Sequence, residues 1–137
     1  MRSDLSASLQ VSASGMEAQM ARVRIIAENL ANQNSTGSSP GADAYRRRTI
    51  SFQNRLNRTL GTETVAVKSV AVDKNAQALR YDPSNPAANN TGYVKVTNIN
   101  SFVELMDMRD AEQSYSANLN VASATRNMLG RTLDLLK

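Results

Sequence analysis

The sequence predicts a mainly α-helical protein in which long N- and C-terminal helices pack as a coiled-coil-like pair, with an extended loop and a small β-hairpin insert between them. Three observations lead to this fold class. Apolar residues recur at alternating steps of three and four in both terminal segments, which is the spacing of a helix seam. The segment between them is rich in Gly, Pro, Asn and Ser. Aromatic residues make up only 4% of the 137 residues and Trp is absent, so the large side chains that usually anchor a globular core are scarce.

The N-terminal helix is expected over residues 3–32, within an N-terminal segment that spans 1–34. Turn-forming residues 32–37 (Asn-Gln-Asn-Ser-Thr-Gly) follow its last apolar position. Gly15 lies inside the seam and costs about 1 kcal/mol relative to Ala in a helix, so we expect it to mark the close approach of another backbone. The seam of this helix consists of Leu9, Ala13, Met16, Met20, Val23, Ala27 and Leu30.

Residues 35–97 are expected to form the extended loop and the small β insert. Residues 35–44 carry no apolar anchor, and residues 45–61 are expected to be extended or irregular. Alternating apolar residues over 65–72 predict a strand, and residues 93–96 predict a second, shorter one. Two or three such strands form a hairpin or a small sheet, which is too small to be stable alone.

The C-terminal helix is expected within residues 98–137, a segment without proline. It carries one apolar stripe at heptad spacing and a second stripe beside it, and the N-terminal helix can cover only one of them. We therefore expect the segments 1–34 and 98–137 to form one helical domain whose remaining apolar face is an interaction surface. A self-contained helical hairpin packed on its own insert is the alternative. The first stripe consists of Leu105, Met108, Glu112, Tyr115, Leu119, Ala122, Arg126, Leu129, Leu133 and Leu136, and the second of Ala117, Val121, Ala124, Met128 and Leu135.

The composition argues against an enzyme. His and Cys are both absent, which removes the best proton shuttle near neutral pH, all thiolate chemistry and most zinc, copper and haem ligation. We therefore expect no catalytic residues, no cofactor and no metal site. The first residues lack the apolar stretch of a secretory leader, and no segment approaches membrane-spanning length. The chain is accordingly expected to be soluble and to be exported, if at all, without a cleavable signal peptide.

The net charge of +4 is distributed unevenly along the chain. Residues 1–60 carry eight Arg and four acidic residues, whereas residues 98–137 carry four basic and five acidic residues. This asymmetry could pair unlike surfaces of neighbouring subunits or bind a polyanion. The alternative function is therefore a small basic helical adaptor that binds a polyanion or nucleic acid through Arg46–Arg58, although base-stacking aromatics are scarce. We expect the Arg side chains to bind carboxylates of the next subunit, with a solvated basic loop as the alternative; they are Arg46, Arg47, Arg48, Arg55 and Arg58.

Short motifs stand at both ends of the chain. The N-terminal motifs are Ser14–Gln19 (SGMEAQ), Ala27–Asn32 (AENLAN) and Asn34–Thr36 (NST), and the C-terminal motifs are Val103–Met108 (VELMDM) and Ala111–Asn118 (AEQSYSAN). Together they resemble the terminal signatures of the bacterial flagellar rod and hook proteins. Three central motifs resemble the short proximal-rod members of that family: Ala44–Thr49 (AYRRRT), Tyr81–Ala87 (YDPSNPA) and Gly92–Lys95 (GYVK).

The resemblance implies a structural subunit of the basal-body rod in the periplasm. It implies that both terminal helices stack around a central export channel and form a drive shaft that transmits torque to hook and filament. Export would use the flagellar type III apparatus. The implied partners are other copies of the chain, the rod proteins FlgB, FlgF and FlgG, and the rod-base adaptor FliE. No small-molecule substrate, nucleic acid or cofactor is implied.

Subunit contacts are predicted to use both helix seams, the end of the first helix and the Arg cluster. Close-packed helices have few alternative packings, so contacts of this kind would resist twisting. The predicted interface residues are Leu9, Met16, Met20, Val23, Leu30, Asn32, Arg46, Arg47, Arg48, Leu105, Met108, Tyr115, Asn118, Leu119, Leu129, Leu133 and Leu136.

Overall fold

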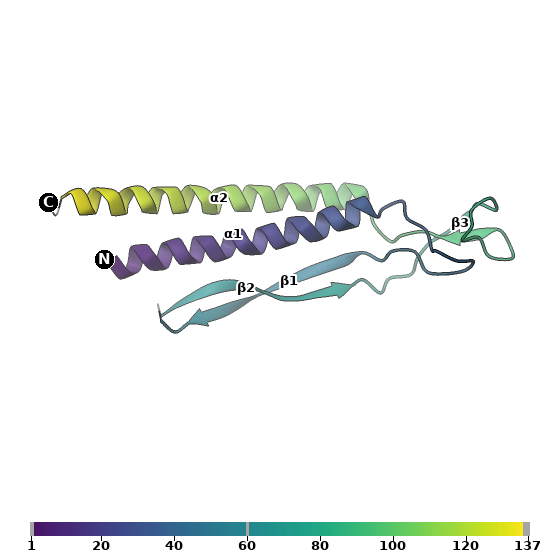
Figure 1. Ribbon diagram of the computed structural model, residues 1–137, viewed down its shortest axis with the longest axis horizontal. Coiled ribbons are helices and arrows are strands. Elements are labelled where there is room, and N and C mark those ends of the chain that lie inside the picture. The colour runs from purple at the N-terminus through teal and green to yellow at the C-terminus, as the bar shows by residue number, and fades with distance from the viewer. Residues whose placement is uncertain (1, 60, 136–137) are drawn as a thin grey trace. The chain divides into compact units, whose positions relative to one another are not determined.

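The computed structural model describes residues 2–59 and 61–135, with the side chains of residues 4–59 and 61–135. Two long helices stand at the ends of the chain, and strands lie between them (Figure 1). The structure confirms the prediction of one helix at each end of the chain with a β-hairpin between them. In chain order the elements are α1 (Arg2–Ala31), β1 (Arg48–Asn57), β2 (Thr62–Val72), β3 (Leu79–Tyr81), β4 (Tyr93–Lys95) and α2 (Ser101–Asp134).

Asparagine side chains cap the end of α1 and the start of α2. Asn32 Nδ2 donates to the Glu28 carbonyl at 2.8 Å and satisfies a carbonyl at the end of α1. Asn100 Oδ1 accepts from the backbone N–H of Phe102 at 3.0 Å, as an N-cap residue does, and α2 therefore begins at Ser101. Residues 98–100, which the sequence placed in the C-terminal segment, precede the helix.

The strands form two separate two-stranded sheets. β1 and β2 pair as a hairpin that contains the strand predicted over 65–72, and residues 48–57, predicted only as extended or irregular, form its other strand. β3 and β4 pair antiparallel, with Arg80 opposite Val94 and Tyr81 opposite Tyr93. The two tyrosine rings meet edge to face at 5.3 Å.

The chain divides into two compact units. The first contains the described residues of Met1–Val23, Ile50–Ser69 and Met108–Lys137, and the second contains Arg24–Thr49 and Val70–Asp107. The buried apolar residues described in the second unit are Ile25, Ile26, Ala44, Ala87 and Val94, all at most 7% exposed.

Within the first unit, α1 contacts α2 on one side and the hairpin on the other (Figure 1). Ser8 Oγ and Thr125 Oγ1 lie 3.3 Å apart, which joins the two helices. The backbone N–H of Val65 donates to Ser14 Oγ at 3.2 Å, which joins the hairpin to α1. A Cβ atom at Gly15 would lie 2.8 Å from Asn118 Nδ2, so the close approach expected at Gly15 is to a side chain of α2 and not to a backbone.

The most buried residues on the helices of the first unit have small or polar side chains: Ser12, Ala18, Ala111 and Thr125. Several large apolar side chains of the same helices are exposed. Met20, Leu119, Val121, Met128 and Leu133 are all exposed.

Candidate assembly interface

Asn29 is the centre of a buried polar network in the second unit. Its side chain is 1% exposed and pairs with both backbone groups of Arg48. Nδ2 donates to the Arg48 carbonyl at 2.8 Å, and Oδ1 accepts from the Arg48 N–H at 2.9 Å. The amide therefore bonds the start of β1 as a neighbouring strand would. Nδ2 also donates to Glu104 Oε2 at 3.0 Å, so one side chain connects α1, β1 and α2.

Arg47 neutralises the acidic side of this network. Glu104 is 1% exposed, and Arg47 Nε donates to its Oε1 at 2.5 Å. Arg47 Nη2 donates to Asp107 Oδ2 at 3.2 Å, so one guanidinium holds two carboxylates on adjacent turns of α2. A buried carboxylate needs such partners, because leaving it unpaired costs several kcal/mol.

Tyr45 closes the network from the loop before β1. Its hydroxyl donates to Asn29 Oδ1 at 3.3 Å. Burial raises the pKa of this hydroxyl above its ordinary value, and the nearby Arg48 partly opposes the rise. The neutral phenol is the form that donates this hydrogen bond.

The other two arginines of the central motif also bind carboxylates of their own chain. Arg48 Nη1 lies 2.6 Å from Glu28 Oε2. Arg46 Nη2 lies 3.1 Å from Asp43 Oδ2, and Arg46 Nη1 donates to the Asn75 carbonyl at 3.0 Å. Lys95, together with Arg46, lowers the pKa of the exposed Asp43 carboxyl. Of the three guanidiniums predicted to bind a neighbouring subunit, those of Arg47 and Arg48 thus hold the start of β1 against the helices, and that of Arg46 joins two loops.

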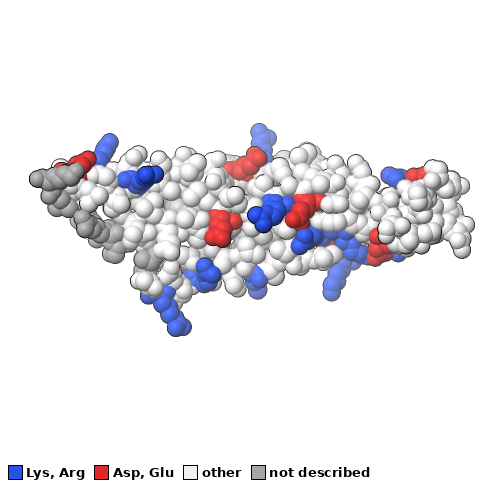
Figure 2. Space-filling model, in the orientation of Figure 1, with Lys and Arg blue, Asp and Glu red and all other residues white. Residues whose placement is uncertain are grey.

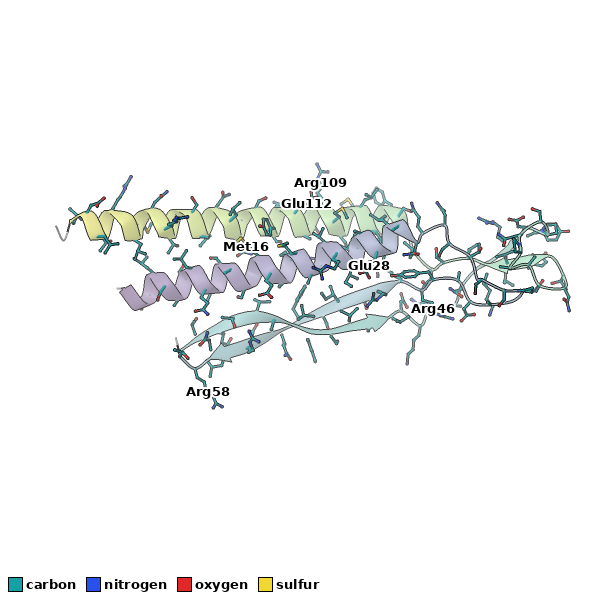
Figure 3. The ribbon with its side chains drawn as sticks, in the orientation of Figure 1. Met16, Glu28, Arg46, Arg58, Arg109 and Glu112 are labelled. Carbon is teal, nitrogen blue, oxygen red and sulfur yellow. The ribbon has the colours of Figure 1, made fainter. Side chains whose placement is uncertain are left out.

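The remaining cations of that region lie on the hairpin. Arg55 and Arg58 are exposed, and neither forms an ion pair with a residue that the structure describes. Lys and Arg side chains stand along the hairpin edge of the visible surface in Figure 2. Figure 3 shows Arg58 projecting from the hairpin on the side away from α1.

Several predicted interface residues of α2 are exposed. Leu105, Leu119 and Leu133 are 56%, 50% and 41% exposed. Met108, Tyr115, Asn118 and Leu129 are half-buried, and Leu136 lies outside the described residues.

The predicted residues of α1 divide in the same way. Met20 is 58% exposed, whereas Leu9, Met16, Val23, Leu30 and Asn32 are half-buried. Met20 and Val23 of α1 and Tyr115 of α2 come together in the first unit, where they line a groove of about 460 Å³ with Glu112 and Ser116.

Sequence reasoning did not identify the buried pair of Glu104 and Asn29 as a site. The apolar stripe that it followed on α2 runs one residue out of step with the buried positions. The buried residues Glu104, Ala111 and Thr125 and the half-buried Asn118 each precede a member of the predicted stripe by one residue. Their signal is the heptad spacing of small and polar residues, which a search for apolar residues does not detect.

Comparison with known proteins decides the family. A family model described as flagella basal body rod protein matches residues 9–37, and one described as flagellar basal body rod FlgEFG protein C-terminal matches residues 90–135. The chain is 48% identical over 133 residues to the flagellar basal-body rod protein FlgC of Agrobacterium fabrum, covering 97% of this chain and 96% of that protein. It is 34% identical to the FlgC of Salmonella typhimurium, covering 91% and 92%, and 33% identical to that of Bacillus subtilis, covering 95% and 97%.

The chain belongs to the FlgC family of flagellar basal-body rod proteins. FlgC proteins are structural components of the flagellar rod and not enzymes, as the composition predicted. The match to two rod-protein models, one at each end, agrees with the motifs that the sequence shows there. Within the described part of the chain, no helix is long and apolar enough to cross a membrane, and no group of three or more acidic, His or Cys residues could hold a metal ion.

Membership of the FlgC family bears on the exposed apolar side chains of α2. A rod component associates with other rod components, and large apolar side chains on an exposed helix face are typical of a protein interaction surface. Within the Arg46–Arg58 stretch of the nucleic-acid alternative, Arg46, Arg47 and Arg48 are engaged by Asp43, Glu104, Asp107 and Glu28, whereas Arg55 and Arg58 have no ion pair among the described residues.

Proposed function

We propose that this chain is a subunit of the proximal rod that polymerises through its terminal helices. In the periplasm, the subunits would form a drive shaft around a central export channel and would transmit torque. The observation that carries the proposal is the exposed apolar face of α2, on which Leu105, Leu119 and Leu133 lie outward although smaller residues are buried. Burial of one such side chain stabilises a contact by roughly 1.5–3 kcal/mol, so a few per subunit are enough for a stable joint.

We further propose that α1 and α2 pair as an antiparallel coiled-coil-like unit, so that the segments 1–34 and 98–137 form one helical domain and 35–97 its insert. Support comes from the register of the contacts. Ser8 lies beside Thr125, and Gly15 lies against Asn118. From the first contact to the second, the residue number rises by seven on α1 and falls by seven on α2, as it does in an antiparallel pair. Asn29 and Glu104 are two further heptads along each helix and are hydrogen-bonded.

The partners of the exposed face would be other copies of the chain, FlgB, FlgF and FlgG, and FliE at the rod base. The type III export apparatus would deliver the chain to the rod. Family membership supports the association with rod components, and the chemistry of the face supports a helical partner.

The test is one polar substitution with a matched control on the same helix. Leu119→Asp places a charge in the apolar face, and Asn120→Asp places the same charge at the next exposed position. Each variant is expressed in a strain that lacks the gene, and swimming in soft agar and incorporation into isolated basal bodies are measured. Leu119→Asp is expected to abolish both, and Asn120→Asp to preserve both.

Purified Leu119→Asp protein must remain folded for that result to report on assembly. Because the substituted side chain is exposed, the free energy of unfolding of the variant, measured in urea, is expected to lie within about 0.5 kcal/mol of that of the unsubstituted protein. A Leu119→Asp strain that swims as well as the Asn120→Asp strain would contradict the proposal.

A further inference from the structure

The tip of the hairpin carries unpaired positive charge beside an exposed apolar side chain. Arg58 is exposed and makes no ion pair with any described residue, while the nearby acid Glu63 accepts a hydrogen bond from Asn54 at 3.0 Å. Leu56, two residues before Arg58, is 59% exposed. A leucine of that exposure beside an uncompensated cation is suited to an apolar recess with an acid at its rim.

The first unit contains such a recess on its other side. The groove of about 460 Å³ between α1 and α2 is lined by apolar Met20, Val23 and Tyr115. Glu112 stands in its lining, is exposed, and has no ion-pair partner among the residues described. In Figure 3, Arg109 projects from the edge of α2 that faces away from α1, so its positive charge is directed away from this groove.

The two surfaces of one copy lie on opposite sides of α1. Figure 3 shows Glu112 on α2 and Arg58 at the free end of the hairpin, with α1 between these two elements of the first unit. The hairpin tip can therefore meet such a groove only on another copy. Direct pairing of two grooves is disfavoured, because it would bring together the Glu112 carboxylates of both copies, which have no ion-pair partner among the described residues.

We propose that the hairpin tip of one copy docks in the α1–α2 groove of a second copy, with Leu56 entering between Met20 and Tyr115 and Arg58 pairing with Glu112. The two surfaces differ, so the contact is heterologous. Each copy retains one free tip and one free groove, and the association is open-ended. The inference rests on the proposed rod function and names a second copy as the partner of this groove.

Introduced cysteines test the contact, because the chain contains no Cys of its own. A Leu56→Cys copy is mixed with a size-tagged Met20→Cys copy under mild oxidation, and the disulfide-linked heterodimer is measured on a non-reducing gel. A disulfide requires Cα atoms within roughly 7 Å of each other, so its formation reports close docking. The control replaces Met20→Cys by Met128→Cys on α2 outside the groove, since Met20 and Met128 are both 58% exposed.

The Leu56→Cys and Met20→Cys pair is expected to form heterodimer on the order of tenfold faster than the control pair, because docking raises the effective concentration of the two thiols. Equal rates for the two pairs would overturn the inference. Predominant linkage between two Leu56→Cys copies would overturn it as well, because it would show a symmetric contact between hairpins.

A charge exchange tests the ion pair separately. Arg58→Glu in the Leu56→Cys copy, or Glu112→Arg in the Met20→Cys copy, is expected to reduce the heterodimer rate to that of the control. Mixing the two charge-reversed copies is expected to restore it, and failure to restore it would overturn the pairing of Arg58 with Glu112.

The outcome is distinguishable from failure of the rod proposal. Equal cross-linking rates in chains that still build a motile flagellum would reject only the hairpin contact. Motility of the Leu119→Asp strain would reject the helix-mediated assembly whatever the cross-linking result.

Discussion

Replacement of Asn29 by alanine is expected to destabilise the chain more than any other single amide deletion in α1. The substitution removes two hydrogen bonds to the Arg48 backbone, one to Glu104 and one from Tyr45. A hydrogen bond contributes about 0.5–1.5 kcal/mol net, and one to a charged group about 1.5–3 kcal/mol. Because these four bonds share one side chain and are not additive, we expect a loss of about 3–5 kcal/mol.

Asn32→Ala is the matched control for this prediction. It removes the same side chain one turn further along, where Asn32 makes one hydrogen bond to the Glu28 carbonyl at 2.8 Å. Its expected cost is about 1 kcal/mol. Both variants are unfolded in urea at equal protein concentration, because self-association would raise the apparent stability. Far-ultraviolet circular dichroism reports the loss of helix.

The comparison refutes the reasoning if Asn29→Ala loses no more free energy of unfolding than Asn32→Ala. That result would mean that water replaces the lost partners and that the network is not a buried unit. Asn29→Asp gives an independent check, since it keeps the shape but places a second carboxylate beside Glu104. It should cost at least as much as Asn29→Ala, because like charges at this distance repel in a buried site.

Two further predictions concern the loop between α1 and β1. Gly37→Ala would place a Cβ atom 2.6 Å from the Ala42 carbonyl oxygen and should lower the free energy of unfolding by about 1–3 kcal/mol. Its control is Gly130→Ala, in open space within α2, which should raise the free energy of unfolding by about 1 kcal/mol. Equal urea midpoints for the two variants would refute this prediction. Because burial raises the pKa of Tyr45 above 10.0, its contribution to stability is complete below pH 10.0 and is lost as the pH rises through the folded-state pKa. Tyr45→Phe should therefore reduce the loss of stability at alkaline pH, which is measured by urea unfolding at a series of pH values. An unchanged loss would show that another group causes it.

The helices were predictable because their apolar residues repeat over several heptads, and residues 65–72 were recognisable as a strand from their alternation. The strand formed by residues 48–57 was harder to assign. It begins with charged and polar residues whose partners lie elsewhere in the chain, so local propensity was indecisive. Its start is fixed by Asn29, a side chain 19 residues earlier on α1.

The orientation of α2 could not be predicted from its apolar pattern. Periodicity identifies an apolar face, but it does not say which molecule covers that face. Here the positions that α1 covers are Ala111, Asn118 and Thr125, whose small or polar side chains allow close approach. Leu105 and Leu119, one residue after a buried position, lie on the exposed side.

The central motif shows the same limit for charged residues. The sequence indicated that Arg46, Arg47 and Arg48 bind carboxylates, and in the structure all three do so. It could not indicate which carboxylates, because Glu104 lies 57 residues from Arg47, and such a separation leaves no local pattern. Charge type is readable from one sequence, whereas long-range pairing is not.

Polar and small residues fix the register of the two helices, so the chain can have a defined fold while large apolar side chains of α2 stay exposed. A buried ion pair of the Arg47–Glu104 kind adds little net stability, since desolvation offsets most of its Coulomb energy. The Arg47–Glu104 pair does disfavour any register of α1 against α2 in which Glu104 would be buried without a partner. A polar residue in the seam of a coiled coil selects one register in the same way. Small buried side chains such as Ala111 then allow the helices to approach closely. Leu105, Leu119 and Leu133 are consequently not needed to align the helices, and under the proposed function they remain for neighbouring subunits.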